Sequence, residues 1–454
     1  MQTVWAEQAL VGDSWMKDVS VVIGADGRIA SVASGAAPSG IRVGALLPAP
    51  VNLHSHAFQR AMAGLTERRS HEARDTFWTW RRLMYRFLDA LTPDDIEAIA
   101  AFVQMEMLES GYAAVAEFHY VHHQADGTPY DDLAELATRI AAASQQSGIG
   151  LTLLPVLYQQ AGCDGAALAP GQVRFGNGID RFAELHERAT RLVASLAPDA
   201  RIGVAPHSLR AVNREGLAAS VALAPNAPLH MHLAEQAGEV EEVVAAYGKR
   251  PVEWLLETHA VDARWCLIHC TQMNDTETIA LARTGAVAGL CPITESSLGD
   301  GIFNGATYVG AGGRFGIGSD SNIRISLTEE LRTLEYSQRL RDRGRAILAT
   351  EAASTGRALY DGAVRGGAQA AGRAAGAIEA GKWADLVAID TSAIDLGGRQ
   401  GDELLDSYIF AGDDRMIRDV WSAGRRLVQA GRHVNRDAIA GRYRRAMDAL
   451  KGRL

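Results

Sequence analysis

The sequence predicts an α/β fold, namely a (β/α)8 barrel of the TIM type with a small flanking β-sandwich domain built from both chain ends. Three observations lead to this prediction. The middle of the chain alternates short apolar runs with longer, charged stretches of helical period, which is typical of repeated βα units. Both chain ends consist of short β-like runs instead. The chain has 454 residues, of which 47% are hydrophobic, so it can bury a large core.

The two chain ends are predicted to be β-structure because they contain short runs divided by turns. Residues 19–32 alternate between apolar and polar and break at Ala25-Asp26-Gly27, which indicates a hairpin. Near the other end, residues 377–390 and 416–431 again form short runs split by glycine-containing turns. We therefore expect the two ends to meet in one domain beside the central part of the chain.

Eight apolar runs of strand length lie between the two ends. They are residues 46–53, 112–118, 149–157, 201–205, 228–231, 265–268, 286–290 and 314–318. Helical stretches are predicted at residues 94–109, 130–147, 180–196, 239–247 and 276–283. Eight strand–helix repeats over roughly 330 residues fit a barrel with insertions.

A doubly wound open sheet is the alternative fold. It is disfavoured because neither GxGxxG nor GxxxxGK[ST] follows the first predicted strand. The resulting domain boundaries are a composite β-sandwich domain of residues 1–47 and 376–454, and a barrel domain of residues 48–375.

The composition disfavours several classes of function. Forty-five basic and 54 acidic side chains give a net charge of -9, which argues against nonspecific binding to nucleic acid or to an anionic membrane. Four cysteines in largely apolar surroundings indicate neither a disulfide framework nor paired CxxC zinc motifs. No basic segment with an apolar core begins the sequence, and no apolar run approaches the length of a membrane span. We expect a cytoplasmic protein that binds neither nucleic acid nor membrane.

Polar residues with metal-binding chemistry fall at the ends of the predicted strands. His54-Ser55-His56 ends the first run, although an HxH pair alone is a weak signal, since His230-Met231-His232 is a second one. His232 ends the fifth run, His269 ends the sixth and Asp320 follows the eighth. In a barrel these strand ends surround one mouth, where the active sites of this fold lie. Imidazoles with one carboxylate suit a divalent cation such as zinc, with a position left open for water.

The sequence favours one metal ion over two. Two-metal barrels of this general kind use a bridging carboxylated lysine or an acidic bridge from a middle strand, and no lysine lies between Lys17 and Lys249. Glu117 is the obvious acidic candidate, but a supporting or structural role fits it better. The histidines at 119, 122 and 123 could suggest a second metal, but we interpret them as a solvated loop cluster.

The order of these residues resembles the amidohydrolase superfamily, in its mononuclear deaminase branch. The matching pattern is HxH after strand one, His and then Glu three residues later after strand five, His after strand six and Asp after strand eight. Within that branch, PAPVNLHSHAFQRAMAGLTE, HLAEQ, CPITESSLGDGIF and GIGSDSNIRISLTEELR resemble the formimidoylglutamate deiminases of histidine degradation. The resemblance covers nearly the whole chain, including the segment GKWADLVAID near its end.

The resemblance implies an activity and a set of site residues. The reaction is hydrolytic deimination of N-formimino-L-glutamate to N-formyl-L-glutamate and ammonia. One divalent ion, zinc or alternatively iron, is expected on His54, His56, His232 and Asp320. Glu235 and His269 are expected to handle protons, with Asp320 assisting. A homodimer is also typical of such families.

The substrate implied by the resemblance carries two carboxylates and a cationic amidine, so its site should contain arginine with neutral hydrogen-bonding partners. Our candidates are Arg82, Tyr120, His207 and Arg210, with Gln59 next. Arg81 is as plausible as Arg82 from its spacing, and the resemblance favours Arg82. The aromatic residues within 77–87 are consistent with either a lid over the site or the core side of a helix.

Two other functions are compatible with parts of the pattern. The same metal core could serve a deaminase of a purine, pyrimidine or related aminoazaheterocycle, but such a ring favours stacking partners over several carboxylate-binding arginines. A catalytically silent barrel used as a binding module is the other alternative. The intact set of ligand and proton-handling residues argues against it.

Overall fold

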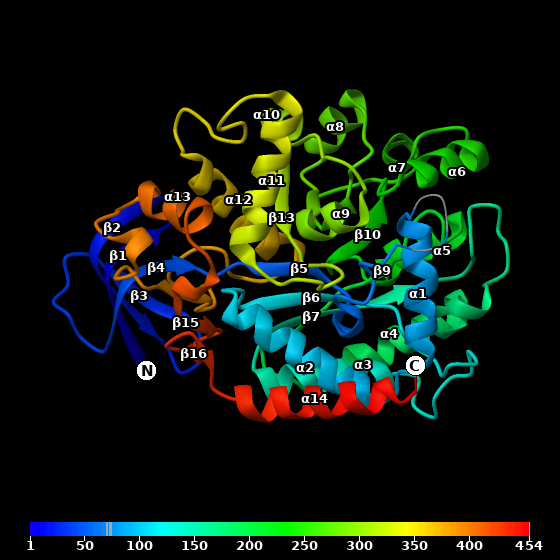
Figure 1. Cartoon of the computed structure of the whole chain (residues 1–454), viewed down its shortest axis with the longest axis horizontal. Helices are drawn as coiled ribbons and strands as arrows, with labels where there is room; N and C mark the ends of the chain where they lie inside the picture. The colour runs from blue at the N-terminus through cyan, green and yellow to red at the C-terminus, as the bar shows by residue number, and fades with distance from the viewer. Residues whose placement is uncertain (70, 72–74, 454) are drawn as a thin grey trace.

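The computed structural model describes residues 1–69, 71 and 75–453, and it consists of a barrel and a flanking β domain (Figure 1). All eight predicted barrel runs contain strands, and the fourth run divides into two short pieces. The strands are β5 (Val51–Ser55), β6 (Ala114–His119), β7 (Gly150–Leu157), β8 (Arg201–Ile202), β9 (Ala205–Pro206), β10 (Leu229–Leu233), β11 (Trp265–His269), β12 (Val287–Leu290) and β13 (Arg314–Ile317).

The barrel closes through two seams between parallel half-sheets. Strands β5 to β8 form one half, with β9 paired to β7, and strands β10 to β13 form the other. At one seam Val204 bridges Leu229. At the other, the His56 N–H donates to the Asp320 carbonyl at 2.9 Å, and the Asp320 N–H donates to the His54 carbonyl at 2.9 Å. This second seam brings the first and last strand ends together.

The predicted helices are present within a few residues of their expected ends. They are α2 (Pro93–Glu109), α3 (Glu135–Ser147), α4 (Ile179–Ala194), α6 (Ala237–Tyr247) and α8 (Asp275–Ala282). A capping box between Thr92 and Asp95, with Pro93 in the first turn, explains the start of α2. Further helices are α1 (Phe77–Asp89), α5 (Arg214–Leu223), α7 (Pro251–Thr258), α9 (Pro292–Leu298), α10 (Gly305–Gly310), α11 (Leu327–Asp342) and α12 (Thr355–Ala370), with 3-10 turns at Ala57–Met62 and Pro170–Phe175.

Both chain ends contribute to one mixed eight-stranded sheet, in the order β17-β16-β15-β14-β4-β1-β2-β3. The strands predicted for a sandwich are therefore joined in a single hydrogen-bonded ladder. The predicted hairpin joins β2 and β3. The strands are β1 (Gln2–Val11), β2 (Ser14–Ile23), β3 (Ile29–Ala33), β4 (Ile41–Pro48), β14 (Leu386–Ile389), β15 (Ile417–Ser422), β16 (Arg425–Gln429) and β17 (Arg432–His433).

One predicted strand boundary is wrong. The run 46–53 was expected to be a single barrel strand, but β4 belongs to the flanking sheet and β5 begins the barrel. Pro48 and Pro50 lie at the division. Because proline has no N–H to donate to a ladder, two prolines so close together interrupt an otherwise continuous apolar run.

Alternate residues of the flanking sheet serve two different cores. Leu46 and Leu386 pack in a core inside the flanking domain, whereas their neighbours Leu47 and Val387 pack in the main core shared with the barrel. This follows from the two-residue period of strands. The flanking domain therefore has its own apolar core and also rests on the barrel.

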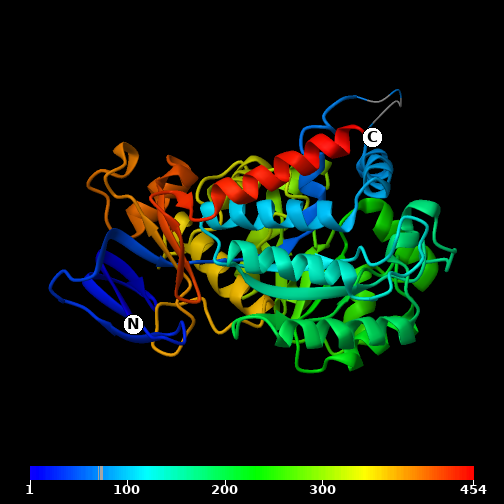
Figure 2. The same ribbon diagram turned by 90° about the horizontal axis from the view of Figure 1, so that it is seen from below.

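The C-terminal helix α14 (Arg436–Lys451) lies along α2 of the barrel (Figure 2). Tyr443 stacks on Phe102 with ring centroids 4.0 Å apart, and the Arg453 guanidinium pairs with the Asp95 carboxylate at 2.7 Å. Residues assigned to the β domain thus continue onto the barrel surface, and the exact domain boundaries stay a prediction. Among the described residues, no helix combines the length and apolar character needed to span a membrane.

Candidate metal centre and active site

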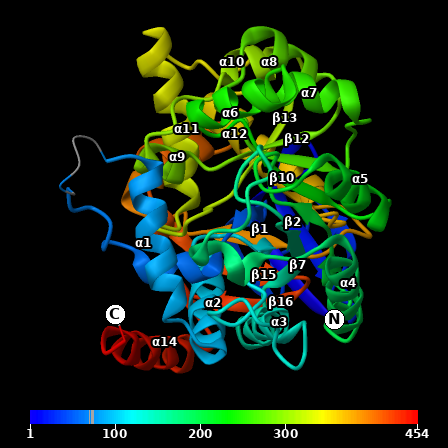
Figure 3. The same ribbon diagram turned by 90° about the vertical axis from the view of Figure 1, so that its right-hand side faces the viewer.

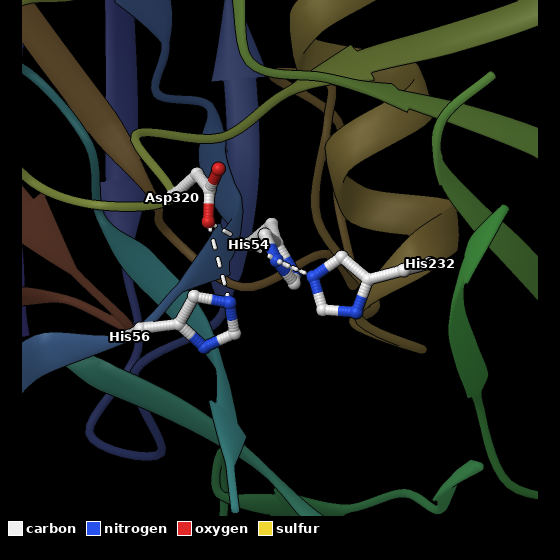
Figure 4. Close-up of side chains that lie close together, drawn as sticks. All are labelled: His54, His56, His232 and Asp320. Atoms are coloured by element: carbon white, nitrogen blue, oxygen red, sulfur yellow. Dashed lines mark hydrogen bonds and ion pairs between the residues drawn. The ribbon is translucent and has the colours of Figure 1, made fainter. Parts of the chain in front are cut away.

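The four predicted metal ligands meet at the carboxyl ends of the barrel strands, where their side chains point toward one another (Figure 4). His54 lies on β5, His232 lies on β10, His56 directly follows β5, and Asp320 lies in the turn after β13, at the closing seam. The Nε2 atoms of His54 and His232 are 3.1 Å apart. Oδ1 of Asp320 lies 3.5 Å from His54 Nε2 and 3.3 Å from His56 Nε2. All four side chains are buried.

A close backbone approach makes this convergence possible. A Cβ atom at Gly318 would lie 2.7 Å from the backbone nitrogen of His54, so a larger residue would separate the two strands at the seam. Asp320 itself has a φ of 48°, in the left-handed region. Its turn is supported by Ser319, whose N–H donates to Asn52 Oδ1 and whose hydroxyl donates to Asn322 Oδ1.

The chemistry of these four residues fits a divalent cation. His56 Nδ1 donates to the Phe118 carbonyl and His232 Nδ1 donates to the His207 carbonyl, both at 3.1 Å, so their Nε2 lone pairs face the centre. Burial lowers the pKa of His54 to about 3, which keeps that ring neutral. The Nε2 atoms of His54 and His232 are only 3.1 Å apart, and lone pairs on both would repel each other unless a cation lies between them.

The Asp320 carboxylate supplies the negative charge of the centre. Burial would raise the pKa of Asp320, but its interactions with His54, His56 and His269 hold it well below its ordinary value. Three neutral imidazoles with one carboxylate are a common ligand set for zinc and related ions.

The two predicted proton-handling residues lie beside this centre. His269 Nε2 is 3.9 Å from Glu235 Oε1 and 3.8 Å from Asp320 Oδ2. Burial raises the pKa of Glu235, against the lowering effect of His269 and Arg210. Burial lowers the pKa of His269, but the carboxylates of Glu235, Glu295 and Asp320 outweigh it and raise the value to about 10. Glu235 and His269 are therefore electrostatically linked, as a proton-transfer pair requires.

Glu239 shapes the backbone that carries Glu235, and sequence reasoning gave it no role. Its buried carboxylate accepts the Ala234 N–H at 3.0 Å and the Glu235 N–H at 3.1 Å. Ala234 has a φ of 51°, so these two bonds stabilise a sharp turn after β10. Glu239 also lies 3.8 Å from Arg210 Nε and contributes to the electrostatic environment of that guanidinium.

A pocket of about 540 Å³, part of it open to solvent, adjoins the centre. Four of the five predicted substrate-binding residues line it, namely Gln59, Tyr120, His207 and Arg210. Gln59 Nε2 donates to the Tyr120 hydroxyl at 2.8 Å, and Arg210 is 4% exposed. Burial and the charge of Arg210 lower the pKa of His207 well below its ordinary value, so that ring is neutral.

Arg82 is the exception, and the structure places Arg81 at the pocket instead. Arg82 is exposed and does not line the pocket, whereas Arg81 does. On a helix, adjacent residues point about 100° apart, so only one of the pair can face the barrel mouth. The face of α1 that lines the pocket has helical spacing and consists of Phe77, Trp80, Arg81, Met84 and Tyr85.

The aromatic helix α1 forms one wall of the site, and Figure 3 shows it at one side of the barrel. Phe77, Trp80 and Tyr85 line the pocket, whereas Phe87 is buried in the main core. The segment 77–87 therefore contributes residues to both the pocket wall and the main core.

Tyr158 also lines the pocket and was missed by sequence reasoning. Its hydroxyl accepts hydrogen bonds from Arg81 Nη2 at 2.7 Å and from Gln172 Nε2 at 2.8 Å. The amide orientation of Gln172 is consistent, because its oxygen accepts the Ala169 N–H. The available signal was the position of Tyr158 directly after the third predicted strand.

Two sequence interpretations away from the pocket are resolved differently. Glu117 accepts the Ala57 N–H at 2.7 Å and lies outside the four-residue centre; burial raises its pKa to about 7.

The predicted solvated histidine cluster is wrong, because His119, His122 and His123 are buried. The backbone N–H groups of the last two both donate to the Arg174 carbonyl, which folds this loop into the core.

Comparisons with known proteins identify similar chains. Residues 45–427 match the amidohydrolase family, and residues 1–41 match the N-terminal domain of formimidoylglutamate deiminase HutF. A formimidoylglutamate deiminase from Pseudomonas aeruginosa is 48% identical over 99% of this chain and 100% of its own. The crystal structure of an amidohydrolase from Brucella melitensis is also 48% identical, with a TM-score of 0.95 over 99% of this chain and 100% of its own. An adenosine deaminase from Xanthomonas campestris with bound zinc shares the fold, at 22% identity and a TM-score of 0.82 over 99% of this chain and 98% of its own.

Proposed function

The chain belongs to the amidohydrolase family and, within it, to the formimidoylglutamate deiminases, and from this premise we propose that it hydrolyses N-formimino-L-glutamate to N-formyl-L-glutamate and ammonia. The observation that carries the proposal is the pocket itself. It places Arg81 and Arg210 beside a centre of three histidines and one aspartate. An amidine with two carboxylates needs both features at once.

We propose that His54, His56, His232 and Asp320 hold one divalent ion, with zinc as the expected metal and iron as the alternative. Such an ion supplies a water-derived nucleophile at neutral pH by lowering the pKa of water toward about 7. The three-histidine, one-carboxylate ligand set supports this assignment.

The chain's own residues account for the proton movements of the reaction. Glu235 takes a proton from the attacking water and delivers it to the amidine nitrogen. The C–N bond then breaks, ammonia leaves, and the formyl C=O forms as the remaining water proton passes from the oxygen to Asp320. His269 hydrogen-bonds and orients the same water, and Asp320 assists its deprotonation as an acceptor.

Two groups of donors suit the two substrate carboxylates. Arg81 and Arg210 offer charged hydrogen bonds to one of them. Gln59, Tyr120 and His207 offer neutral hydrogen bonds to the other. The sharpest test of the function is ammonia release from formiminoglutamate, cytosine, guanine and adenosine by the metal-loaded protein. Release from formiminoglutamate alone supports the proposal, and release from a ring compound instead supports the heterocycle deaminase.

Removal of the metal is expected to abolish activity, and one equivalent of zinc per chain is expected to restore it. The reason is that one set of four ligands meets at the strand ends and no lysine is available to bridge a second ion. Elemental analysis together with ammonia release measures this. Full activity after exhaustive chelation would contradict the assignment. Two equivalents in fully active protein would instead point to a second group of possible ligands, namely His269, Cys291 and Glu295.

Tyr158→Phe is expected to raise KM for formiminoglutamate while the metal stays bound. The Tyr158 hydroxyl already accepts two hydrogen bonds, so its own proton is left to donate to a ligand in the pocket. Losing a hydrogen bond to a charged group costs roughly 1.5 to 3 kcal/mol. If Tyr158→Phe has no further effect in an Arg81→Met background, Tyr158 acts only by holding Arg81.

The remaining predictions concern the whole molecule. We propose that the chain forms a homodimer in the cytoplasm, and that the domain division lies near residues 47 and 375. Sedimentation of the purified protein tests the first of these. Limited proteolysis tests the division between the domains.

A further inference from the structure

Glu295 lies in the segment CPITESSLGDGIF, which carried part of the family resemblance but received no role. It sits in the first turn of α9 and is 5% exposed. Its Oε1 atom takes part in two hydrogen bonds, one from the Cys291 N–H at 2.9 Å and one with His269 Nδ1 at 3.2 Å. These two bonds link the end of β11 to the start of α9, beside the metal centre.

The direction of the second hydrogen bond can be assigned from the first. The Cys291 N–H is a backbone donor, so Glu295 Oε1 acts as an acceptor. The same oxygen has a further lone pair to accept a second N–H, so the Nδ1 atom of His269 donates the hydrogen in their contact. Glu295 therefore engages one named ring nitrogen, Nδ1, as a hydrogen-bond donor.

The same contact also sets which edge of the ring faces the pocket. The ring torsion of histidine is broad and roughly two-fold, so the backbone position alone does not choose between two flipped orientations. With Nδ1 on Glu295, the Nε2 atom lies 3.8 Å from Asp320 Oδ2 and 3.9 Å from Glu235 Oε1. A flipped ring would present carbon where Nε2 now lies.

We propose that Glu295 is a positioning residue for the reaction and acts through His269. It holds the ring with Nδ1 donating to its carboxylate and Nε2 directed at the space between Glu235 and Asp320. This inference rests on the proposed function, in which His269 orients the attacking water. Glu295 itself does not line the pocket.

The competing explanation is that Glu295 only caps α9. Its bond to the Cys291 N–H satisfies a backbone donor at the start of the helix, which is a common structural role for an acidic side chain. Glu295→Gln separates the two roles. The amide oxygen can still accept the Cys291 N–H, but it is a weaker acceptor for the histidine because the charge is gone.

Glu295→Gln is expected to lower kcat by roughly 10- to 100-fold, the usual effect of losing a residue that orients an active-site group, with little change in KM or Tm. The downfield Nδ1 proton resonance of His269, assigned by its loss in His269→Asn, should move upfield in Glu295→Gln. Glu277→Gln is the matched control. Glu277 is a buried carboxylate that accepts the N–H of Asn274 at the start of α8 and pairs with Arg250, away from His269.

Three outcomes would overturn the inference. They are a less than twofold change in kcat with a lowered Tm, an unchanged His269 resonance, and an equal loss of kcat in Glu277→Gln. The resonance does not depend on turnover. If the wild-type protein fails to hydrolyse formiminoglutamate but the His269 resonance still moves in Glu295→Gln, the proposed function is refuted. The Glu295–His269 contact is then established independently of it.

Discussion

Glu235→Gln is expected to keep its metal and lose roughly 10²- to 10⁴-fold in kcat, the usual contribution of a positioned acid–base group. The amide preserves the shape of the side chain but cannot accept a proton from water and pass it to the amidine nitrogen. Metal binding should persist because Glu235 is not among the four convergent ligands. Ammonia release gives kcat, and elemental analysis gives the metal content.

Glu241→Gln is a suitable control for this prediction. Glu241 is an exposed carboxylate on α6, a short distance along the chain from Glu235. The same loss of charge there should leave kcat unchanged. A less than threefold effect of Glu235→Gln would remove Glu235 from the mechanism, whereas loss of metal would make it a supporting residue of the centre.

The metal centre could be predicted from the sequence because strand ends have fixed positions in a barrel. Once eight strands are recognised, residues that follow strands one, five and eight must surround one mouth. His54, His232 and Asp320 satisfy this condition in the structure. The close approach that joins them depends on Gly318, whose importance appears only when the first and last strands are seen side by side.

The pocket wall could not be predicted as well, because it depends on the rotation of a helix. Arg81 and Arg82 have the same chemistry and differ only by about 100° around α1. The phase of α1 is fixed by which of its aromatic residues pack on the barrel. The apolar residues on both faces of this helix, Trp78 and Trp80 among them, make that phase ambiguous in the sequence. Tyr158 was missed for a related reason, since a single tyrosine after a strand carries no motif.

Arg81→Met and Arg210→Met are each expected to lower kcat/KM for formiminoglutamate by roughly 2 to 4 kcal/mol, as for the loss of a charged hydrogen-bonding partner at a desolvated site. KM should rise, and the metal should stay bound. Both arginines line the pocket, and Arg210 is buried with its Nε atom lacking a hydrogen-bond partner in the described chain. A substrate carboxylate would supply that partner.

Arg82→Met provides the matched control, because Arg82 carries the same charge one residue along α1 but is exposed and outside the pocket. It should lose far less than Arg81→Met. A neutral formamidine supplies the second comparison, since it lacks carboxylates and already forfeits the binding energy of the arginines. The two pocket variants should therefore be impaired much less towards it. If they lower kcat/KM equally for the charged and the neutral compound, the arginines are structural. The glutamate-derived substrate would then rest on family membership alone.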